Sequence, residues 1–136
     1  MPQLISLAIV GENGSEFYVE CTDYDAARCS DFVQTVVVPQ LGRLKGRAMP
    51  FDHVRQALRA WIGGIPTTSR PVLCYDCEMD LSLLRALLDG SLPDGWALEN
   101  IQGQLDAARQ TAYYARHGGE HHALHDARAN AQAYIG

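Results

Sequence analysis

The sequence has few cysteines and contains no long hydrophobic run. A membrane-spanning helix needs about 20 consecutive, mostly apolar residues, so we expect no membrane span. The first ten residues, MPQLISLAIV, lack the positive charges and the small-residue cleavage site of a secretory signal. We therefore expect a cytoplasmic protein whose 4 cysteines are reduced thiols.

Basic residues are also scarce, since 11 lysines and arginines face 16 acidic residues, for a net charge of -5. Proteins that coat duplex nucleic acid usually have a basic face, because phosphate contacts dominate their affinity. This composition excludes a simple basic DNA-coating module, but not an enzyme whose carboxylates hold divalent metal ions. The length of 136 residues, without internal repeats, indicates a single domain over residues 1–136.

Hydrophobic periodicity predicts strands and helices in alternation. Strands are expected at residues 4–10, 16–21, 71–75 and 96–101, and Asn13 and Gly14 predict a hairpin between the first two. Helices are expected at residues 30–37, 51–62, 80–89, 104–116 and 122–134. This order predicts an α/β fold with one mixed sheet and helices on its faces.

Cys74 and Cys77 form a C-x-x-C pair with three possible interpretations. A redox pair would open a helix after a strand and have a lowered thiol pKa. A zinc site would need a second pair of ligands at a suitable spacing. Because Cys74 lies in the apolar run PVLCY, the sequence favours a buried structural cysteine.

Two polar segments carry the residues suited to chemistry. Asp80 follows the predicted strand 71–75 at the start of a helix, and such junctions lie at the sheet edge where α/β proteins bind ligands. The segment HHALHDA has His121 five residues before Asp126. Carboxylates bind Mg²⁺ or Mn²⁺, and a nearby histidine can deprotonate an attacking water.

Each of these residues also has a simpler interpretation. Asp80 could be a helix N-cap, and Asp126 could be a solvated charge in the first turn of a helix. The histidines could form a surface cluster, or His121 and His125 could form a zinc pair one helical turn apart.

Together the two segments resemble motifs of the DEDDh exonucleases. HHALHDA resembles their third motif, in which a histidine precedes a metal-binding aspartate by five residues and an alanine follows. YDCEMDLSLL resembles their second motif, in which an aspartate precedes a helix with a Leu-Leu pair. The resemblance implies that Asp80 and Asp126 bind Mg²⁺ or Mn²⁺ and that His121 is the general base. It places Asp76 at a substrate-binding position, where many relatives have asparagine.

The order of the remaining segments is similar to a bacterial and phage branch of 3′-5′ exoribonuclease-like proteins. The similar segments are LISLAIV, ENG, EFY and CSDFV with the valine-rich stretch that ends at Pro39, so the resemblance spans nearly the whole chain. It implies an RNase H-like fold that hydrolyses phosphodiester bonds of RNA or single-stranded DNA. In the loop 42–50, Arg43, Lys45 and Arg47 either contact the substrate backbone or are simply solvated.

The chain departs from this family at its start. Relatives begin with a strand that carries D-x-E, and no D-x-E precedes Leu4. Two metal ions need several anionic ligands, so Asp80 and Asp126 alone supply too few, and Glu12 and Glu20 lie in the hairpin, poorly placed to substitute. Because the missing strand is central in relatives, we expect an N-terminally incomplete sheet whose open edge favours a homodimer.

Three functions follow from these observations. The first is a metal-dependent 3′-5′ exonuclease, shortened in this chain. The second is a catalytically inactive domain of the same fold that binds nucleic acid or another protein. The third is a small zinc protein that uses Cys74, Cys77 and the histidines.

Overall fold

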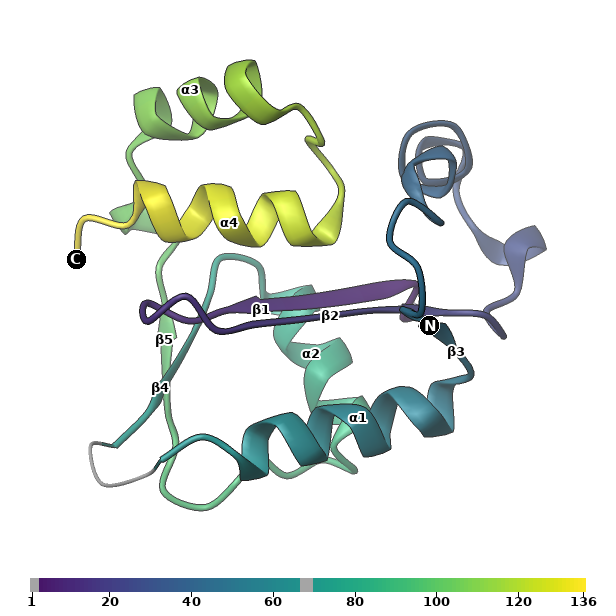
Figure 1. Ribbon diagram of the computed structural model, residues 1–136, viewed down its shortest axis with the longest axis horizontal. Coiled ribbons are helices and arrows are strands. Elements are labelled where there is room, and N and C mark those ends of the chain that lie inside the picture. Colours follow the sequence, from purple (N-terminus) through teal and green to yellow (C-terminus); the bar gives the residue numbers. More distant parts are fainter. Residues whose placement is uncertain (1–2, 67–69) are drawn as a thin grey trace.

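The computed structural model describes residues 3–66 and 70–136 of an α/β protein with two sheets (Figure 1). The first sheet is mixed, with strand order β1-β2-β3, and the second is a parallel pair, β4-β5. The strands are β1 (Ser6–Val10), β2 (Glu16–Cys21), β3 (Ala48–Met49), β4 (Val72–Tyr75) and β5 (Ala97–Asn100).

The predicted hairpin is confirmed. Strands β1 and β2 are antiparallel, in a register that pairs Ser6 with Glu20 and Val10 with Glu16. In the turn, the Gly11 N–H donates to the Ser15 carbonyl at 2.7 Å. Gly14 has a φ of 89°, a backbone conformation that glycine adopts without steric cost.

The prediction of an α/β fold with a mixed sheet is confirmed in this coarse form, but the strands divide into two sheets instead of one. In the described part of the chain, β1 pairs only with β2, and β4 pairs only with β5. The outer edges of β1 and β4 therefore carry backbone groups without a strand partner. No described strand lies between these two edges to join the sheets.

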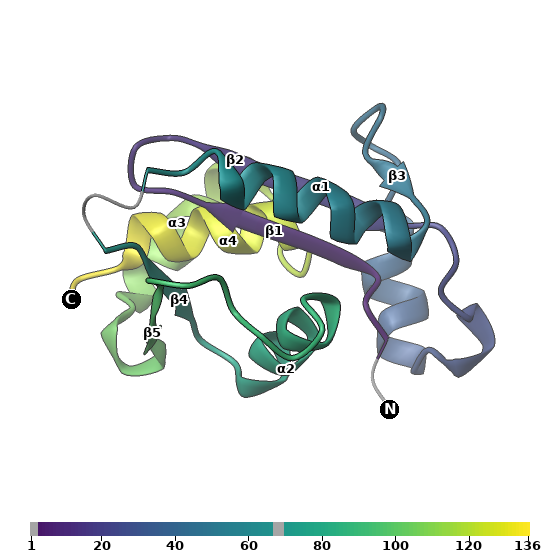
Figure 2. The same cartoon turned by 90° about the horizontal axis from the view of Figure 1, so that it is seen from below.

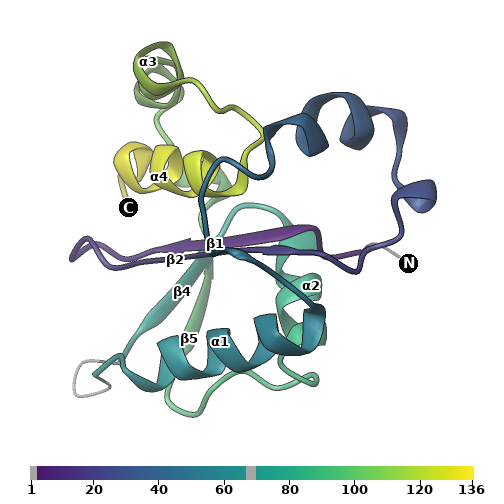
Figure 3. The same ribbon diagram turned by 45° about the vertical axis from the view of Figure 1, so that its right-hand side comes forward.

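The helices lie on both faces of the hairpin (Figures 1 and 3). Helix α1 packs against β2 on one face, and α4 packs against β1 on the other, where α3 covers α4. The α-helices are α1 (Phe51–Gly63), α2 (Glu78–Leu87), α3 (Ala107–His117) and α4 (Ala123–Ala133). Shorter helical turns are η1 (Ala26–Arg28), η2 (Val33–Val37), η3 (Val38–Gln40) and η4 (Gln102–Gln104). No helix in the described ranges is long and apolar enough to cross a membrane.

The main hydrophobic core lies between α1, α2 and the hairpin (Figure 2). Val54 and Leu58, four residues apart on α1, point inward and are both 0% exposed. Helix α2 contributes Leu84 and Leu87 from its own apolar face. The helical spacing of these residues explains why both helices dock on this side of the hairpin.

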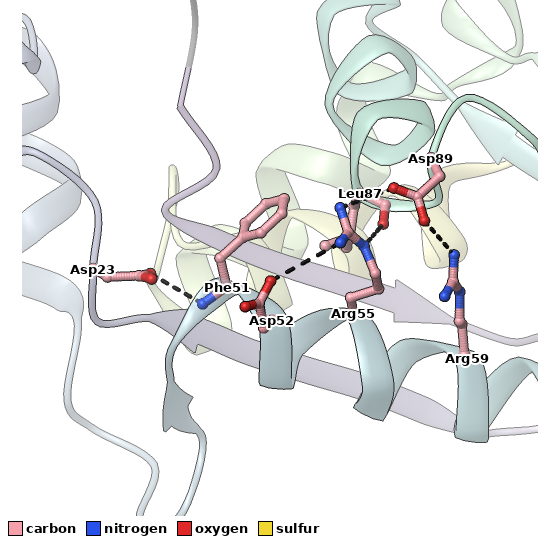
Figure 4. A network of polar contacts seen from close by, with 7 residues as sticks. All are labelled: Asp23, Phe51, Asp52, Arg55, Arg59, Leu87 and Asp89. Atoms are coloured by element: carbon pink, nitrogen blue, oxygen red, sulfur yellow. Dashed lines mark hydrogen bonds and ion pairs between the residues drawn. The ribbon is translucent and has the colours of Figure 1, made fainter.

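A polar network ties α1 to the end of α2 (Figure 4). Arg55 Nε donates to the Leu87 carbonyl at 2.6 Å, one of the carbonyls that a helix leaves unpaired at its C-terminus. The guanidinium of Arg55 also lies 3.2 Å from the Asp89 carboxylate, which in turn accepts a bond from Arg59 at 2.7 Å. At the start of α1, the Phe51 N–H donates to Asp23 at 3.0 Å.

The segment expected as a helix at residues 30–37 is helical, but with π-helical hydrogen bonds over Val33–Val37. Ser30 caps it as expected, since its Oγ accepts from the Val33 N–H at 3.2 Å. Thr35 Oγ1 donates to the Asp31 carbonyl at 2.7 Å, a back-bond of the kind that distorts helices.

Candidate functional site

The candidate site is built around Asp126, which lies in the first turn of α4. Asp126 Oδ1 accepts two hydrogen bonds, one from the Tyr114 hydroxyl at 2.7 Å and one from the His121 N–H at 2.9 Å. Within the described residues, Oδ2 accepts none. The carboxylate is therefore held through one of its two oxygens.

His121 is held in an uncommon backbone conformation beside this carboxylate. Its φ is 70°, in the left-handed region, which costs a non-glycine residue about 1–2 kcal/mol. The Phe32 ring meets the imidazole edge-on at 5.0 Å between centroids, and Glu120 Oε1 lies 3.4 Å from its Nε2. The side chain is 45% exposed, so it is accessible to water while its backbone is fixed on Asp126. Such strain is common at functional sites.

Asp80 reaches the same region from α2. The N-cap of α2 is Cys77, so the interpretation of Asp80 as an N-cap is wrong. Partial burial, and then the negative charges of Asp76 and Asp126, raise the pKa of Asp80. Asp126 thus lies close enough for its charge to act on Asp80, although the two residues belong to different helices. We call Asp76, Asp80 and Asp126 the acidic site.

The electrostatics of Asp126 are set by opposing effects. Burial raises its pKa, while the hydrogen bonds from Tyr114 and from the His121 backbone lower it without cancelling the rise. The pKa of the Tyr114 hydroxyl is raised by its own burial and by its bond to Asp126. Burial, the main cause, makes the charged form of this carboxylate costly, and a bound cation would offset that cost.

The acidic site does not by itself fit the two Mg²⁺ or Mn²⁺ ions implied by the resemblance. In the described ranges, no three His, Cys, Asp or Glu side chains gather closely enough to hold a metal ion. Two ions require several anionic ligands to offset their mutual repulsion. Asp80 and Asp126 meet only part of that requirement.

The expectation of a buried Cys74 is wrong, because both Cys74 and Cys77 are exposed. Strand β4 alternates, with Val72 and Cys74 turned outward and Leu73 packed on the core. The zinc interpretation finds no support in the described residues, since no group of three ligands forms there.

The other two histidines of the segment have structural partners. His125 Nδ1 lies 2.8 Å from the Tyr113 hydroxyl. His122 is buried, and its Nδ1 accepts the Leu124 N–H at 3.3 Å as the N-cap of α4. The rings of His122 and His125 lie 5.4 Å apart, but His122 is buried, and among the described residues the histidines form no group of three metal ligands.

Arg43, Lys45 and Arg47 lie exposed in the loop between η3 and β3. The positive charge of Arg43 contributes to lowering the pKa of both His122 and His125, so Arg43 lies near the start of α4. The loop itself is fixed at Gly42, whose N–H donates to Glu20 Oε1 at 3.0 Å.

Sequence reasoning missed Tyr114, which fixes Asp126, and we expect a measurable effect from its removal. Tyr114→Phe deletes the hydrogen bond that favours the charged carboxylate, so the pKa of Asp126 should rise further. A carboxyl ¹³C NMR titration measures this shift. Tyr75→Phe is the control, because the Tyr75 hydroxyl makes no hydrogen bond within the described residues. An unchanged or lowered pKa in Tyr114→Phe would contradict the prediction.

The histidines also predict how stability depends on pH. Burial lowers the pKa of His122 and of His125 below 6.5, so the folded chain binds fewer protons than the unfolded chain. The stabilisation is complete above pH 6.5 and is lost as the pH falls through the folded-state values. We expect the melting temperature to fall from about pH 8 to about pH 5.5. His125→Gln should flatten this decline, and the exposed His53→Gln should leave it unchanged. A melting temperature that rises on acidification over this range would refute the assignment.

No known protein family and no curated protein matches this chain. The structure places the His121 N–H on the Asp126 carboxylate at the start of α4, and the charge of Asp126 contributes to raising the pKa of Asp80 at the start of α2.

Proposed function

We propose that the chain is a metal-dependent 3′-5′ exonuclease domain of RNase H-like fold that acts on RNA or single-stranded DNA. The observation that carries this proposal is the hydrogen bond from the His121 N–H to the Asp126 carboxylate at 2.9 Å, together with a second carboxylate on another helix, Asp80, whose pKa the charge of Asp126 helps to raise. These are the residues that the DEDDh resemblance assigns to metal binding and to proton transfer.

In this proposal the residues of the chain have distinct roles. His121 accepts a proton from the attacking water, since its imidazole is exposed while its backbone is held on Asp126. Asp126 and Asp80 would hold the divalent ions against the scissile phosphate, and Asp76 would contact the substrate, as the resemblance assigns them. Divalent ions would supply the positive charge that allows carboxylates and a phosphate to approach. Asp80 and Asp126 supply only part of the anionic ligand set that two such ions use, so we expect hydrolysis by this chain to be slow.

That shortage of ligands favours a second candidate function. The absence of a three-ligand metal group in the described ranges suits a catalytically inactive domain that binds nucleic acid or a protein. In that case Arg43 and the neighbouring exposed basic residues Lys45 and Arg47 would contact phosphates, and the acidic site would have no catalytic role.

The unpaired edges of β1 and β4 suit association of two copies, whichever of the two functions holds. We propose a homodimer, which sedimentation analysis would test.

A nuclease assay distinguishes the two candidates. Single-stranded RNA and DNA labelled at the 5′ end are incubated with the full chain and Mn²⁺, with chelator as the negative control. The exonuclease proposal expects stepwise shortening from the 3′ end, no shortening of substrates with a blocked 3′ end, and loss of activity in Asp126→Asn. Intact substrate with retained binding, measured by fluorescence anisotropy, would support the second candidate. If the chain neither cleaves nor binds RNA or DNA, the exonuclease proposal and the nucleic-acid-binding form of the second candidate are both wrong.

A further inference from the structure

Two polar residues outside the acidic site are almost completely buried. Glu20 in β2 is 4% exposed, and His122 at the start of α4 is 3% exposed. Buried polar groups are costly unless they are hydrogen-bonded. Tyr18 supplies the missing partner, because its Oη lies 2.5 Å from Glu20 Oε2 and 3.2 Å from His122 Nε2. The side chains of Glu20, Tyr18 and His122 thus form one continuous hydrogen-bond network between β2 and α4.

The donor and the acceptor of each hydrogen bond in this network can be assigned. The Leu124 N–H donates to His122 Nδ1 at 3.3 Å, so Nδ1 carries no proton. The Glu20 carboxylate already accepts from the Gly42 N–H, and it accepts from the Tyr18 hydroxyl as well. The Tyr18 oxygen must then accept from His122 Nε2–H. The network therefore requires a neutral His122 protonated at Nε2.

His122, at one end of this network, belongs to the backbone segment that carries His121 and Asp126. The His122 N–H donates to the Gly119 carbonyl at 2.8 Å, and its own carbonyl accepts from the Asp126 N–H at 2.8 Å. The imidazole thus anchors a turn that contains His121 on one side and Asp126 on the other. Gly119 is needed here, since its φ is 78° and a Cβ would lie 2.3 Å from His125 Cδ2.

We propose that Glu20, Tyr18 and His122 are positioning residues that lock the His122 tautomer and thereby hold His121 and Asp126 in place. This inference rests on the proposed exonuclease function for its consequence on rate, but its structural claim stands apart from activity. Burial and the neighbouring His125 lower the pKa of His122, which agrees with the neutral form. A second link acts on the same turn, because Gln40 Nε2 donates to the Glu120 carbonyl at 2.9 Å.

The wild-type chain provides the first test without any substitution. In ¹⁵N-labelled protein at about pH 7, two-bond correlation spectra report which imidazole nitrogen is protonated. We expect His122 to show a protonated Nε2 and an unprotonated Nδ1. A doubly protonated ring, or a proton on Nδ1, would overturn the proposal, because the Leu124 N–H would then have no acceptor.

The second test uses Tyr18→Phe, which removes one hydroxyl and so breaks the hydrogen bonds of Tyr18 with Glu20 and with His122. We expect amide exchange at His121 and Leu124 to accelerate about tenfold, the factor that corresponds to about 1.4 kcal/mol. The Asp126 carboxyl resonance should shift, and the nuclease kcat should fall while KM stays unchanged. Tyr134→Phe is the matched control, since the Tyr134 hydroxyl lies 3.3 Å from Glu99 at the far end of α4.

The NMR measurements and the nuclease assay test the positioning role and the exonuclease function separately. If Tyr18→Phe leaves exchange at His121 and the Asp126 resonance as in wild type, the positioning role is refuted, whatever the nuclease activity. If the NMR results are as expected but no form of the chain cleaves RNA or DNA, the positioning role stands and the exonuclease function is refuted. Equal effects of Tyr134→Phe and Tyr18→Phe would also refute the positioning role, because they would reflect a general loss of stability.

Discussion

Replacing His121 by alanine is expected to lower the rate of phosphodiester hydrolysis by about 10²- to 10⁴-fold, the usual contribution of a general base. The ring is 45% exposed, and the backbone N–H, not the imidazole, donates to Asp126, so the substitution should leave that carboxylate in place. Single-turnover cleavage of labelled single-stranded RNA in Mn²⁺ measures the effect. A rate within a few-fold of wild type would remove His121 from the proposed mechanism.

A matched variant separates loss of the ring from loss of backbone geometry. His121→Gly also lacks the imidazole, but glycine adopts the φ of 70° without strain. We expect the glycine variant to be as inactive as His121→Ala, yet more stable than it by about 1 kcal/mol. If glycine restored activity, the strained backbone rather than the imidazole would be what the reaction needs.

Leu58→Ala is expected to have the largest effect on stability, a loss of about 2–5 kcal/mol. Leu58 is 0% exposed and lies in the core between α1, α2 and the hairpin. Truncation removes transfer free energy and leaves a cavity that rigid neighbours fill only in part. Urea unfolding measures the change in the free energy of unfolding.

Leu44→Ala provides the control for this prediction. Leu44 is 39% exposed, so its truncation should change the free energy of unfolding by no more than about 0.5 kcal/mol. A small effect at Leu58 together with an equal effect at Leu44 would mean that the core described here is not the one that stabilises the chain.

Local sequence signals predicted most elements, because their causes are local. The Asn13 and Gly14 turn specifies a hairpin by itself, and the spacing of Val54 and Leu58 specifies the inner face of α1. The same signals misjudged β4. Its apolar run suggested that Cys74 is buried, but an edge strand can leave alternate residues exposed, as Val72 and Cys74 are.

The candidate site was predicted only where a motif marked it. Asp80 stood out by its place between a strand and a helix, and His121 and Asp126 by their spacing, but how α2 lies relative to α4 depends on packing between distant segments. Nothing local distinguishes His122 from His121, although the first is buried and the second exposed. That difference arises because Tyr18, far away in the sequence, contacts the His122 ring and not the His121 ring. Tyr114 was missed for the same reason.

The division into two sheets has a consequence for how the molecule loses its structure. In the described residues, no backbone hydrogen bond links β1, β2 or β3 to β4 or β5, so the β4–α2–β5 segment closes its own ladder. It is attached to the remainder by apolar packing of α2, by the contacts of Arg55 and Arg59 with Leu87 and Asp89, and by the Tyr134 hydroxyl on Glu99. Such a segment can detach as a separate cooperative unit. Asp80 would leave with it, so the acidic site would come apart before the hairpin melts.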